Sequence, residues 1–332
     1  MNDIGSKYSL LDFIENVIEN VSGYKTGDNY TFADLFAGTG VVGTAYKEKG
    51  AYVIANDIQY YSYVLNKHFI ENIPPLNNDL GVVLNSLKPL KGFIYNNYCE
   101  GSGSGRNYFT DSNGKKCDAI RTFLEEAHSS GEMSDAEYFY YLASLINSID
   151  KYANTASVYA AFLKHIKKSA AKDFTLSLLP VISGQAGKVY NEDVNDLITK
   201  INGDILYLDP PYNARQYSAN YHILETIAKY DNPALRGITG LRDYEQQKSS
   251  FCSKRTAPAA LDTLIKNADF GYIFLSYNNE GLMSADTIRD IMSAYGKYSV
   301  YTKEYKRFKA DKDENRRIAG SEVVEYIHCL KK

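Results

Sequence analysis

The stretch TFADLFAGTGVVGTAYKEKGAYVIAND, residues 31–57, decides the fold. Its first six residues, 31–36, form a short apolar run typical of a buried strand. Residues 41–49 have the composition of a helix, and Gly50 stands where a C-terminal helix cap is expected. Residues 51–55 are a second apolar run. A strand, a glycine-rich turn, a helix and a strand in this order predict one βαβ unit of a parallel sheet.

The turn between the first strand and the helix carries three glycines, Gly38, Gly40 and Gly43, in the pattern G-x-G-x-x-G. Glycine at these positions lets the backbone turn tightly and approach a ligand closely. Asp57 follows the second strand, where a carboxylate can accept hydrogen bonds from both hydroxyls of a ribose. The pattern is typical of a dinucleotide site, of the adenosyl-cofactor site of a methyltransferase, or of a simple glycine turn. The strand context and Asp57 favour a nucleoside-type cofactor.

A second motif, LYLDPPY at residues 206–212, follows another predicted strand. Because each proline fixes its own φ and restricts the residue before it, this segment is rigid. The Asp209 carboxylate and the Pro210 carbonyl are then fixed hydrogen-bond acceptors beside the ring of Tyr212. They suit the two N–H donors of an exocyclic amino group on a planar base. A plain turn after a strand is the alternative interpretation, and the earlier glycine motif disfavours it.

The remaining pattern predicts an α/β sheet interrupted by an insertion. Helices are expected over 10–21 and 284–295, parallel strands at 189–190, 205–208 and 272–275, and a closing pair of strands over 298–305 and 322–329.

Within the insertion, Asn113–Gly114 predicts a hairpin turn, Ser134 with Glu137 caps a helix that runs to about 149, and 156–170 is expected to be helical. We therefore predict a discontinuous catalytic domain, residues 1–73 and 172–332, and an inserted, mainly helical region, residues 74–171.

Composition excludes several classes of protein. The 332 residues are 44% hydrophobic, enough for a large core, and no apolar stretch approaches the length of a membrane span. The N-terminus lacks the apolar block of a signal peptide, so we expect a cytoplasmic protein. The four cysteines form no Cys-x-x-Cys pair, which argues against a disulfide framework or a zinc site, and no metal is expected.

The net charge is −3, yet residues 229–255 and 303–317 each carry a local excess of three positive charges. Such segments permit a DNA-binding face without demanding one, since charge runs are more often only solvated surface. The thirty tyrosines are compatible with base stacking and equally with ordinary packing.

The sequence DLFAGTG at residues 34–40, followed by DPPY at 209–212, resembles the Dam-like, alpha-class N6-adenine DNA methyltransferases. The resemblance covers nearly the whole chain. It implies a Rossmann-like sheet that uses S-adenosylmethionine and releases S-adenosylhomocysteine, with double-stranded DNA as substrate. The insertion lies between Asp57 and Asp193, which is the alpha-class order and makes it the expected target-recognition region. A cognate restriction endonuclease acting separately would accompany a restriction-modification enzyme, whereas an orphan methyltransferase would have none.

The resemblance also implies roles for single residues. Lys7 suits the cofactor carboxylate, Asp57 its ribose and Asp193 its adenine edge, although Asp3 stands where the family often has an aromatic residue. The expected cofactor-binding residues are Lys7, Phe36, Ala37, Gly38, Thr39, Gly40, Asp57, Asp193 and Asp209, and the expected catalytic residues are Asp209, Pro210, Pro211 and Tyr212. Candidate DNA contacts are Lys115, Lys116, Arg121, Arg215, Arg236 and Arg242.

Other functions remain open at this point. An amino-group methyltransferase acting on RNA or protein would more often show Asn at the first position of the second motif and would lack the insertion. A nucleotide-cofactor oxidoreductase would leave residues 209–212 unexplained. A non-catalytic DNA-binding module would be expected to have lost one of the two motifs. These comparisons favour a DNA adenine N6-methyltransferase.

Overall fold

A computed structural model describes residues 7–306 and 322–332 of the chain. The described residues form two compact units. Among the described residues, the sheet unit comprises residues 7–58, 184–216, 248–306 and 322–332, and the helical unit comprises residues 59–183 and 217–247. The helical unit therefore contains the whole predicted insertion together with flanking segments on both sides.

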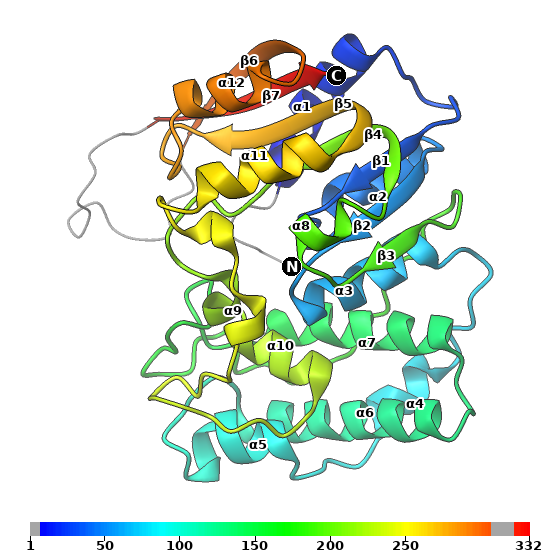
Figure 1. Ribbon diagram of the computed structural model, residues 1–332. Coiled ribbons are helices and arrows are strands. Elements are labelled where there is room, and N and C mark those ends of the chain that lie inside the picture. Colours follow the sequence, from blue (N-terminus) through cyan, green and yellow to red (C-terminus); the bar gives the residue numbers. More distant parts are fainter. Residues whose placement is uncertain (1–6, 307–321) are drawn as a thin grey trace. The chain divides into compact units, whose positions relative to one another are not determined.

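The sheet unit is built on a seven-stranded sheet in the order β3-β2-β1-β4-β5-β7-β6 (Figure 1). The first five strands of that order are parallel, and β7 is antiparallel to both β5 and β6. The predicted βαβ unit, the later parallel strands and the closing antiparallel pair are thus confirmed. The strands are β1 (Thr31–Asp34), β2 (Tyr52–Asn56), β3 (Lys188–Tyr190), β4 (Asn202–Leu208), β5 (Asp269–Asn278), β6 (Lys297–Lys306) and β7 (Glu322–Lys331).

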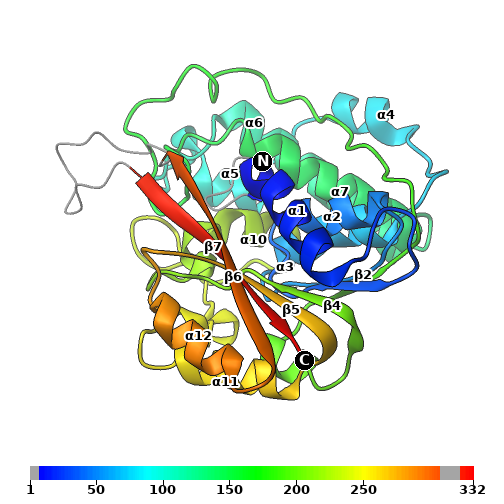
Figure 2. The ribbon, with the colours of Figure 1, turned by 90° about the horizontal axis from the view of Figure 1, so that it is seen from above.

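Helices cover both faces of this sheet, with α1 and α2 on one side and α11 and α12 on the other (Figures 1 and 2). Successive strand residues point to opposite faces, so β1 and β4 supply both cores. On the first face Phe32 stacks on Tyr46 of α2 with ring centroids 3.7 Å apart. On the second, Leu206 belongs to a cluster with Leu261 and Ile288. The helices are α1 (Leu11–Ser22), α2 (Val41–Glu48), α8 (Val194–Leu197), α11 (Ala257–Asn267) and α12 (Ala285–Ser293), with 3-10 turns at Lys7–Leu10 and Ser250–Cys252.

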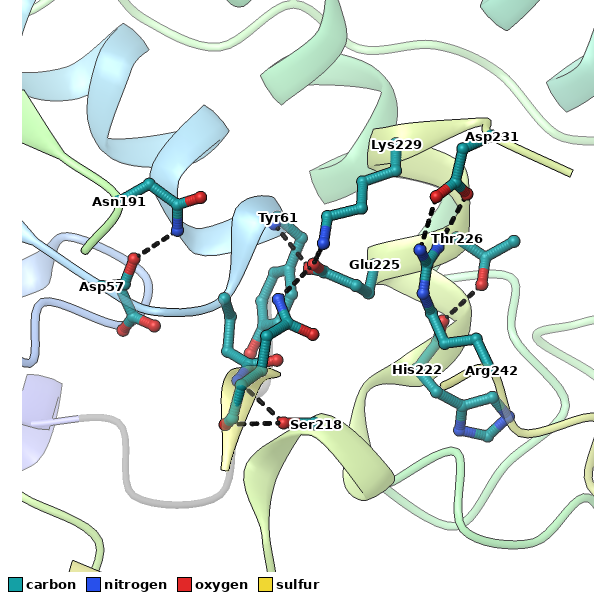
Figure 3. Close-up of polar contacts among 12 residues, drawn as sticks. Asp57, Tyr61, Asn191, Ser218, His222, Glu225, Thr226, Lys229, Asp231 and Arg242 are labelled. Carbon is teal, nitrogen blue, oxygen red and sulfur yellow. Dashed lines mark hydrogen bonds and ion pairs between the residues drawn. The ribbon is translucent and has the colours of Figure 1, made fainter. Parts of the chain in front are cut away.

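The helical unit has its own core, which is rich in buried tyrosine and aliphatic side chains. Glu225 ties three of its segments together: its buried carboxylate accepts from the Tyr61 N–H, the Gln247 amide and the Lys229 ammonium (Figure 3). The elements are α3 (Tyr60–Asn66), a π-helical turn (Lys67–Glu71), α4 (Leu80–Ser86), α5 (Phe93–Tyr98), α6 (Asp111–Ser129), α7 (Asp135–Asp150), α9 (Tyr217–Asn220) and α10 (His222–Lys229), with 3-10 turns at Glu100–Ser102 and Glu245–Gln247.

The predicted hairpin turn at Asn113–Gly114 is wrong, because both residues lie in the first turns of α6. Thr110 caps that helix by accepting from the Asn113 N–H. Gly114 is required by packing rather than by a turn, since a Cβ built there would lie 2.0 Å from the Cys99 Sγ. The Asn113 side chain is buried and bonds to the backbone of residues 170–174.

The predicted helix over 156–170 is also wrong, whereas the capped helix starting after Ser134 is confirmed as α7. Residues 156–170 form turns around the buried side chain of Asn154. Its amide donates to the carbonyls of Asn107 and Leu163 and accepts from the Lys167 N–H. A polar side chain that bonds the backbone in this way offers an alternative to helical hydrogen bonds, so local composition alone misled the prediction.

Candidate active site

The two predicted motifs meet at the carboxyl ends of the central strands. β1 lies between β2 and β4, so the chain order reverses at this point of the sheet. In open α/β sheets ligands bind outside the carboxyl ends of the strands at such a reversal. The glycine turn follows β1, Asp57 follows β2, and Asp209 follows β4. This edge of the sheet is therefore the candidate active site.

The glycine turn has the conformation that its sequence predicts. Gly38 and Gly40 have φ values of 51° and 81°, a region that favours glycine. The Gly38 N–H donates to Asp57 Oδ2 over 2.8 Å. Asn191 donates from its side chain to the Asp57 carbonyl over 2.6 Å, which orients the end of β2 (Figure 3). A Cβ built on Gly38 meets nothing within 4 Å, so the turn opens onto space beside the Asp57 carboxylate.

Neighbouring polar residues hold the strand ends in register. The Asn56 side chain is buried, donates to the carbonyls of Leu35 and Glu192, and accepts from the Glu192 N–H. Asp193 is exposed and caps α8 by accepting from the Asn195 N–H. Phe36 packs edge-on against Phe251, with ring centroids 5.2 Å apart. Asp193 and Phe36 thus lie at the same sheet edge as the glycine turn.

The DPPY segment continues β4 and carries an ion pair that the sequence did not reveal. Lys7 Nζ lies 3.0 Å from Asp209 Oδ1 and 2.9 Å from Glu325 Oε1. The Lys7 side chain is 6% exposed, that of Asp209 15%, and that of Glu325 0%. The same ammonium lies 5.4 Å from the ring centroid of Tyr212. Lys7, which the resemblance assigned to a cofactor carboxylate, is held between two carboxylates of the protein.

Tyr212 is positioned by the loop that follows β5. Its carbonyl accepts from the Leu282 N–H over 3.1 Å, and its ring meets that of Tyr277 edge-on at 6.0 Å. Gly281 allows this loop to pass Tyr277, since a Cβ there would lie 2.1 Å from the tyrosine ring. The loop that begins at Tyr277 therefore supports the DPPY segment.

Burial and neighbouring charges shift the ionisation of these groups. Burial raises the pKa of Asp209 to about 6, an effect that Lys7 opposes and Glu325 reinforces. Burial, Asp209 and Asp57 raise the pKa of Asp34 to about 8. Burial acts to lower the pKa of Lys7, but the carboxylates of Asp209 and Glu325 raise it well above its ordinary value. The site is thus an acidic cluster around one buried cation.

Sequence reasoning missed Asp34 and Glu325 as members of this site. Asp34 ends β1 and is the first residue of the DLFAGTG motif, so its position beside the glycine turn was a usable signal. Glu325 lies on β7, the last strand, with no motif around it. Ser276 at the end of β5 donates to Glu325 Oε1 over 2.6 Å. The pairing of β5 with β7 brings Glu325 next to Ser276 at this edge of the sheet.

Two of the candidate DNA contacts are structural in this fold. Arg121 is 1% exposed, and its guanidinium donates to the carbonyls of Ile227 and Ala228 and to the side chains of Glu125 and Tyr138. Arg242 is buried and forms a two-bond ion pair with Asp231 (Figure 3). A surface contact to DNA does not fit either residue.

The other four candidates remain at the surface to different degrees. Lys116 is half-buried and donates to the Phe174 carbonyl, and Lys115 lies over the Tyr95 ring. Arg215 and Arg236 are exposed. The basic run 303–317 lies mostly outside the described residues.

His222 and the four cysteines have structural environments in this fold. His222 is buried, contacts the carbonyls of Ala219 and Thr239, and has a pKa lowered mainly by burial. The four cysteines, all within the described ranges, are buried free thiols. None of the described helices has the length and apolar character needed to cross a bilayer.

An α/β sheet with a glycine turn after β1 and Asp-Pro-Pro-Tyr after β4 defines the class of amino-group methyltransferases. The model of the D12 class N6 adenine-specific DNA methyltransferases matches residues 4–291, and the chain belongs to that family. This membership sets aside the oxidoreductase that the glycine motif alone had left open.

Named relatives are similar along the full chain. The chain is 50% identical to the type II methyltransferase M.NlaIII of Neisseria lactamica over 100% of this chain and 99% of that protein. It is 36% identical to the type II methyltransferase M.CviAII of Paramecium bursaria Chlorella virus 1, covering 98% and 96% of the two chains. It is 39% identical to M.FokI of Planomicrobium okeanokoites, of which it covers 53%. The chain is therefore similar to whole type II methyltransferases and to about half of a longer one.

Proposed function

We propose that the protein is a site-specific DNA methyltransferase that transfers a methyl group from S-adenosylmethionine to N6 of an adenine flipped out of duplex DNA. The observation that carries the proposal is the Asp209 carboxylate, paired with buried Lys7 and followed by the Pro210 carbonyl at the end of β4. Family membership and the similarity to type II methyltransferases support the same reaction.

The residues at the sheet edge fit S-adenosylmethionine. The open space at Gly38, next to the Asp57 carboxylate, suits a ribose, and Asp193 lies after the neighbouring strand for the adenine edge. Asp34 Oδ1 and Glu325 Oε2 are buried acceptors without a hydrogen-bond donor among the described residues. An excess of carboxylates over cations suits a ligand that carries a sulfonium and an ammonium. The Lys7 ammonium donates to Glu325 Oε1 and lies 3.0 Å from Asp209 Oδ1, and an ammonium with three N–H donors can also serve a cofactor carboxylate.

The proposed chemistry needs few protein groups. The cofactor supplies an already activated methyl group, so the protein mainly positions reactants and stabilises charge. Asp209 and the Pro210 carbonyl accept from the two N6–H bonds and favour a pyramidal nitrogen whose lone pair is free to attack. Positive charge develops on N6 as it bonds the methyl group and the methyl–sulfur bond breaks, so that S-adenosylhomocysteine leaves. The ionised Asp209 stabilises this charge as it forms, and the surplus N6 proton is then lost through Asp209 to solvent. Pro211 holds the segment rigid.

The DNA substrate must present its adenine outside the helix, because the amino group of a stacked base cannot reach such acceptors. Tyr212 is the proposed stacking partner for the base. The helical unit, which contains residues 74–171, is the proposed target-recognition region, and Arg215, Arg236 and Lys115 are the proposed phosphate contacts. The proposal includes a bacterial cytoplasmic location, since the substrate is genomic DNA, and leaves a separate cognate endonuclease as a partner to be sought.

A labelled-methyl assay tests the proposal. Purified protein is incubated with tritiated S-adenosylmethionine and unmethylated genomic DNA, and the digested nucleosides are separated. We expect label in N6-methyladenine and none with the Asp209→Asn variant. Label in cytosine would overturn the base assignment, and transfer only to RNA or protein would overturn the substrate.

A further inference from the structure

The carboxylate of Glu325 lies at the centre of the Lys7 contacts although it belongs to the last strand of the sheet. Lys7 Nζ bridges Glu325 Oε1 and Asp209 Oδ1, and Ser276 donates to the same Glu325 oxygen over 2.6 Å. All of these residues belong to the sheet unit. The Lys7 ammonium is thus shared by the carboxylates of Asp209 and Glu325, and so far only Asp209 has a role in the proposed reaction.

Burying such a cluster is costly unless each group is paired. Glu325 is fully buried, Ser276 is 0% exposed, and Glu325 Oε2 has no hydrogen-bond donor among the described residues. Moving a carboxylate out of water is unfavourable, and an apolar residue of similar size would often stabilise the fold as well or better. Stability alone therefore gives little reason for a carboxylate at position 325. Its contact with Lys7 gives one.

We propose that Glu325, held by Ser276, is a positioning residue for methyl transfer, which draws the Lys7 ammonium partly away from Asp209 and so leaves the Asp209 carboxylate available to the amino group. The inference rests on the proposed function. An ammonium paired with Asp209 alone would hold its carboxylate more strongly and make it a weaker acceptor for the N6–H donors. Sharing the ammonium between two carboxylates preserves the orientation of Asp209 without neutralising it.

The charges around Asp209 determine whether its pKa should rise or fall in a Glu325 variant. Lys7 faces it from the 3-10 turn before α1, Glu325 from β7, Asp34 from β1 and Tyr207 from β4. Glu325→Gln removes a negative charge close to Asp209 and leaves Lys7 with one anionic partner. Both effects favour the ionised form of Asp209, so its pKa should fall.

The experiment measures the single-turnover rate of methyl transfer to DNA between pH 5 and pH 8 for wild type, Glu325→Gln and Ser276→Ala. For Glu325→Gln we expect the acidic side of the pH–rate profile to shift about one pH unit lower and the maximal rate to fall about tenfold. The KM for DNA and the dissociation constant of S-adenosylmethionine should stay within about twofold of wild type. Ser276→Ala keeps the negative charge of Glu325, so it should lower the maximal rate without shifting the pH–rate profile.

A direct readout is the 13C carboxyl resonance of Asp209, assigned with Asp209→Asn and titrated in the protein without cofactor. Cys329→Ala is the matched control, because Cys329 is also buried on β7 and lies outside the Lys7 contacts. An unmoved resonance in Glu325→Gln, or an equal shift of the pH–rate profile in Cys329→Ala, would overturn the inference. Should Glu325→Gln fail to fold, a wild-type rate for Ser276→Ala would overturn it. Absence of methyl transfer by the wild type would instead reject the proposed function.

Discussion

Asp209 is the residue on which the proposed chemistry depends, and two neighbours pull its ionisation in opposite directions. Burial and Glu325 raise its pKa, while Lys7, 3.0 Å away, lowers it. The outcome is a pKa of about 6, above the ordinary value for aspartate but below neutral pH. The side chain is therefore mostly ionised at pH 7 and able to accept from an amino group.

This environment predicts a pH dependence for the reaction. The ionised form of Asp209 is the acceptor, so the rate should be constant above the pKa of about 6 and fall about tenfold per pH unit below it. Asp209→Asn should lose about 1000-fold or more at every pH. Single-turnover rates measured from pH 4.5 to pH 8 check both, and a profile that stays flat through pH 5 would remove Asp209 from the mechanism.

Asp57 carries a separate prediction about cofactor binding. Its carboxylate accepts from the Gly38 N–H and borders the open side of the glycine turn. Asp57→Ala should weaken binding of S-adenosylmethionine about 10- to 100-fold, because the ribose hydroxyls lose a charged acceptor. Calorimetric titration of the folded variant measures this loss. Exposed Asp196 in α8 offers a matched control, whose change to Ala should leave the dissociation constant as in wild type.

At the scale of elements, α6 shows how tertiary packing overrides a local signal. Asn-Gly is a strong hairpin signal in sequence, yet here it begins a 19-residue helix. Thr110 caps the start of the helix, and the buried Asn113 side chain bonds to the backbone of residues 170–174, while Cys99 leaves no room for a side chain at position 114. Glycine at position 114 is thus required by Cys99, a residue that lies outside the Asn113–Gly114 pair.

Gly114→Ala should therefore destabilise the protein even though alanine is the better helix former. We expect the free energy of unfolding to fall by about 2 kcal/mol, the usual cost of overpacking a tight core, measured by urea denaturation. Gly81→Ala in α4 is the control, since the added methyl would meet only the movable end of the Leu178 side chain. A Gly114→Ala variant as stable as wild type would mean that the contact relaxes without cost.

At the scale of the whole molecule, net charge is a poor guide to the DNA-binding surface. The chain is acidic, and Arg121 and Arg242 are buried and bonded to groups of the protein itself. Arg121 satisfies two backbone carbonyls in the helical unit, whereas Arg215 and Arg236 are exposed. Arginines that look equivalent in the sequence therefore have different expected effects.

Substitution by alanine should separate these classes. Arg215→Ala and Arg236→Ala should leave the free energy of unfolding within about 0.5 kcal/mol of wild type and each reduce the slope of log K against log salt for DNA binding by about one. Arg121→Ala should cost about 3 kcal/mol of stability, since it leaves buried acceptors without donors. Salt titrations of DNA affinity and denaturant melts measure the two effects. Equal salt slopes for wild type and both exposed-arginine variants would remove those residues from the DNA surface.

The sequence by itself determined the sheet and the identity of its two motifs. Strand residues alternate or run apolar over short spans, and the glycines and prolines constrain their own backbone, so these signals act over a few residues. The βαβ unit, the closing strands, the capped helix α7 and the positions of Asp57 and Asp209 at strand ends could all be predicted for that reason.

Only the tertiary structure decided which side chains gather at the site and which are buried away from it. Lys7 and Glu325 are 318 residues apart, and no local pattern links them. Their contact exists because β7 inserts antiparallel beside β5 and brings its carboxylate to the end of β4. Long-range packing also places Asn113–Gly114 in a helix and buries Arg121 in the core. Neither could be read from a local pattern, because burial is a property of the assembled chain and not of any segment.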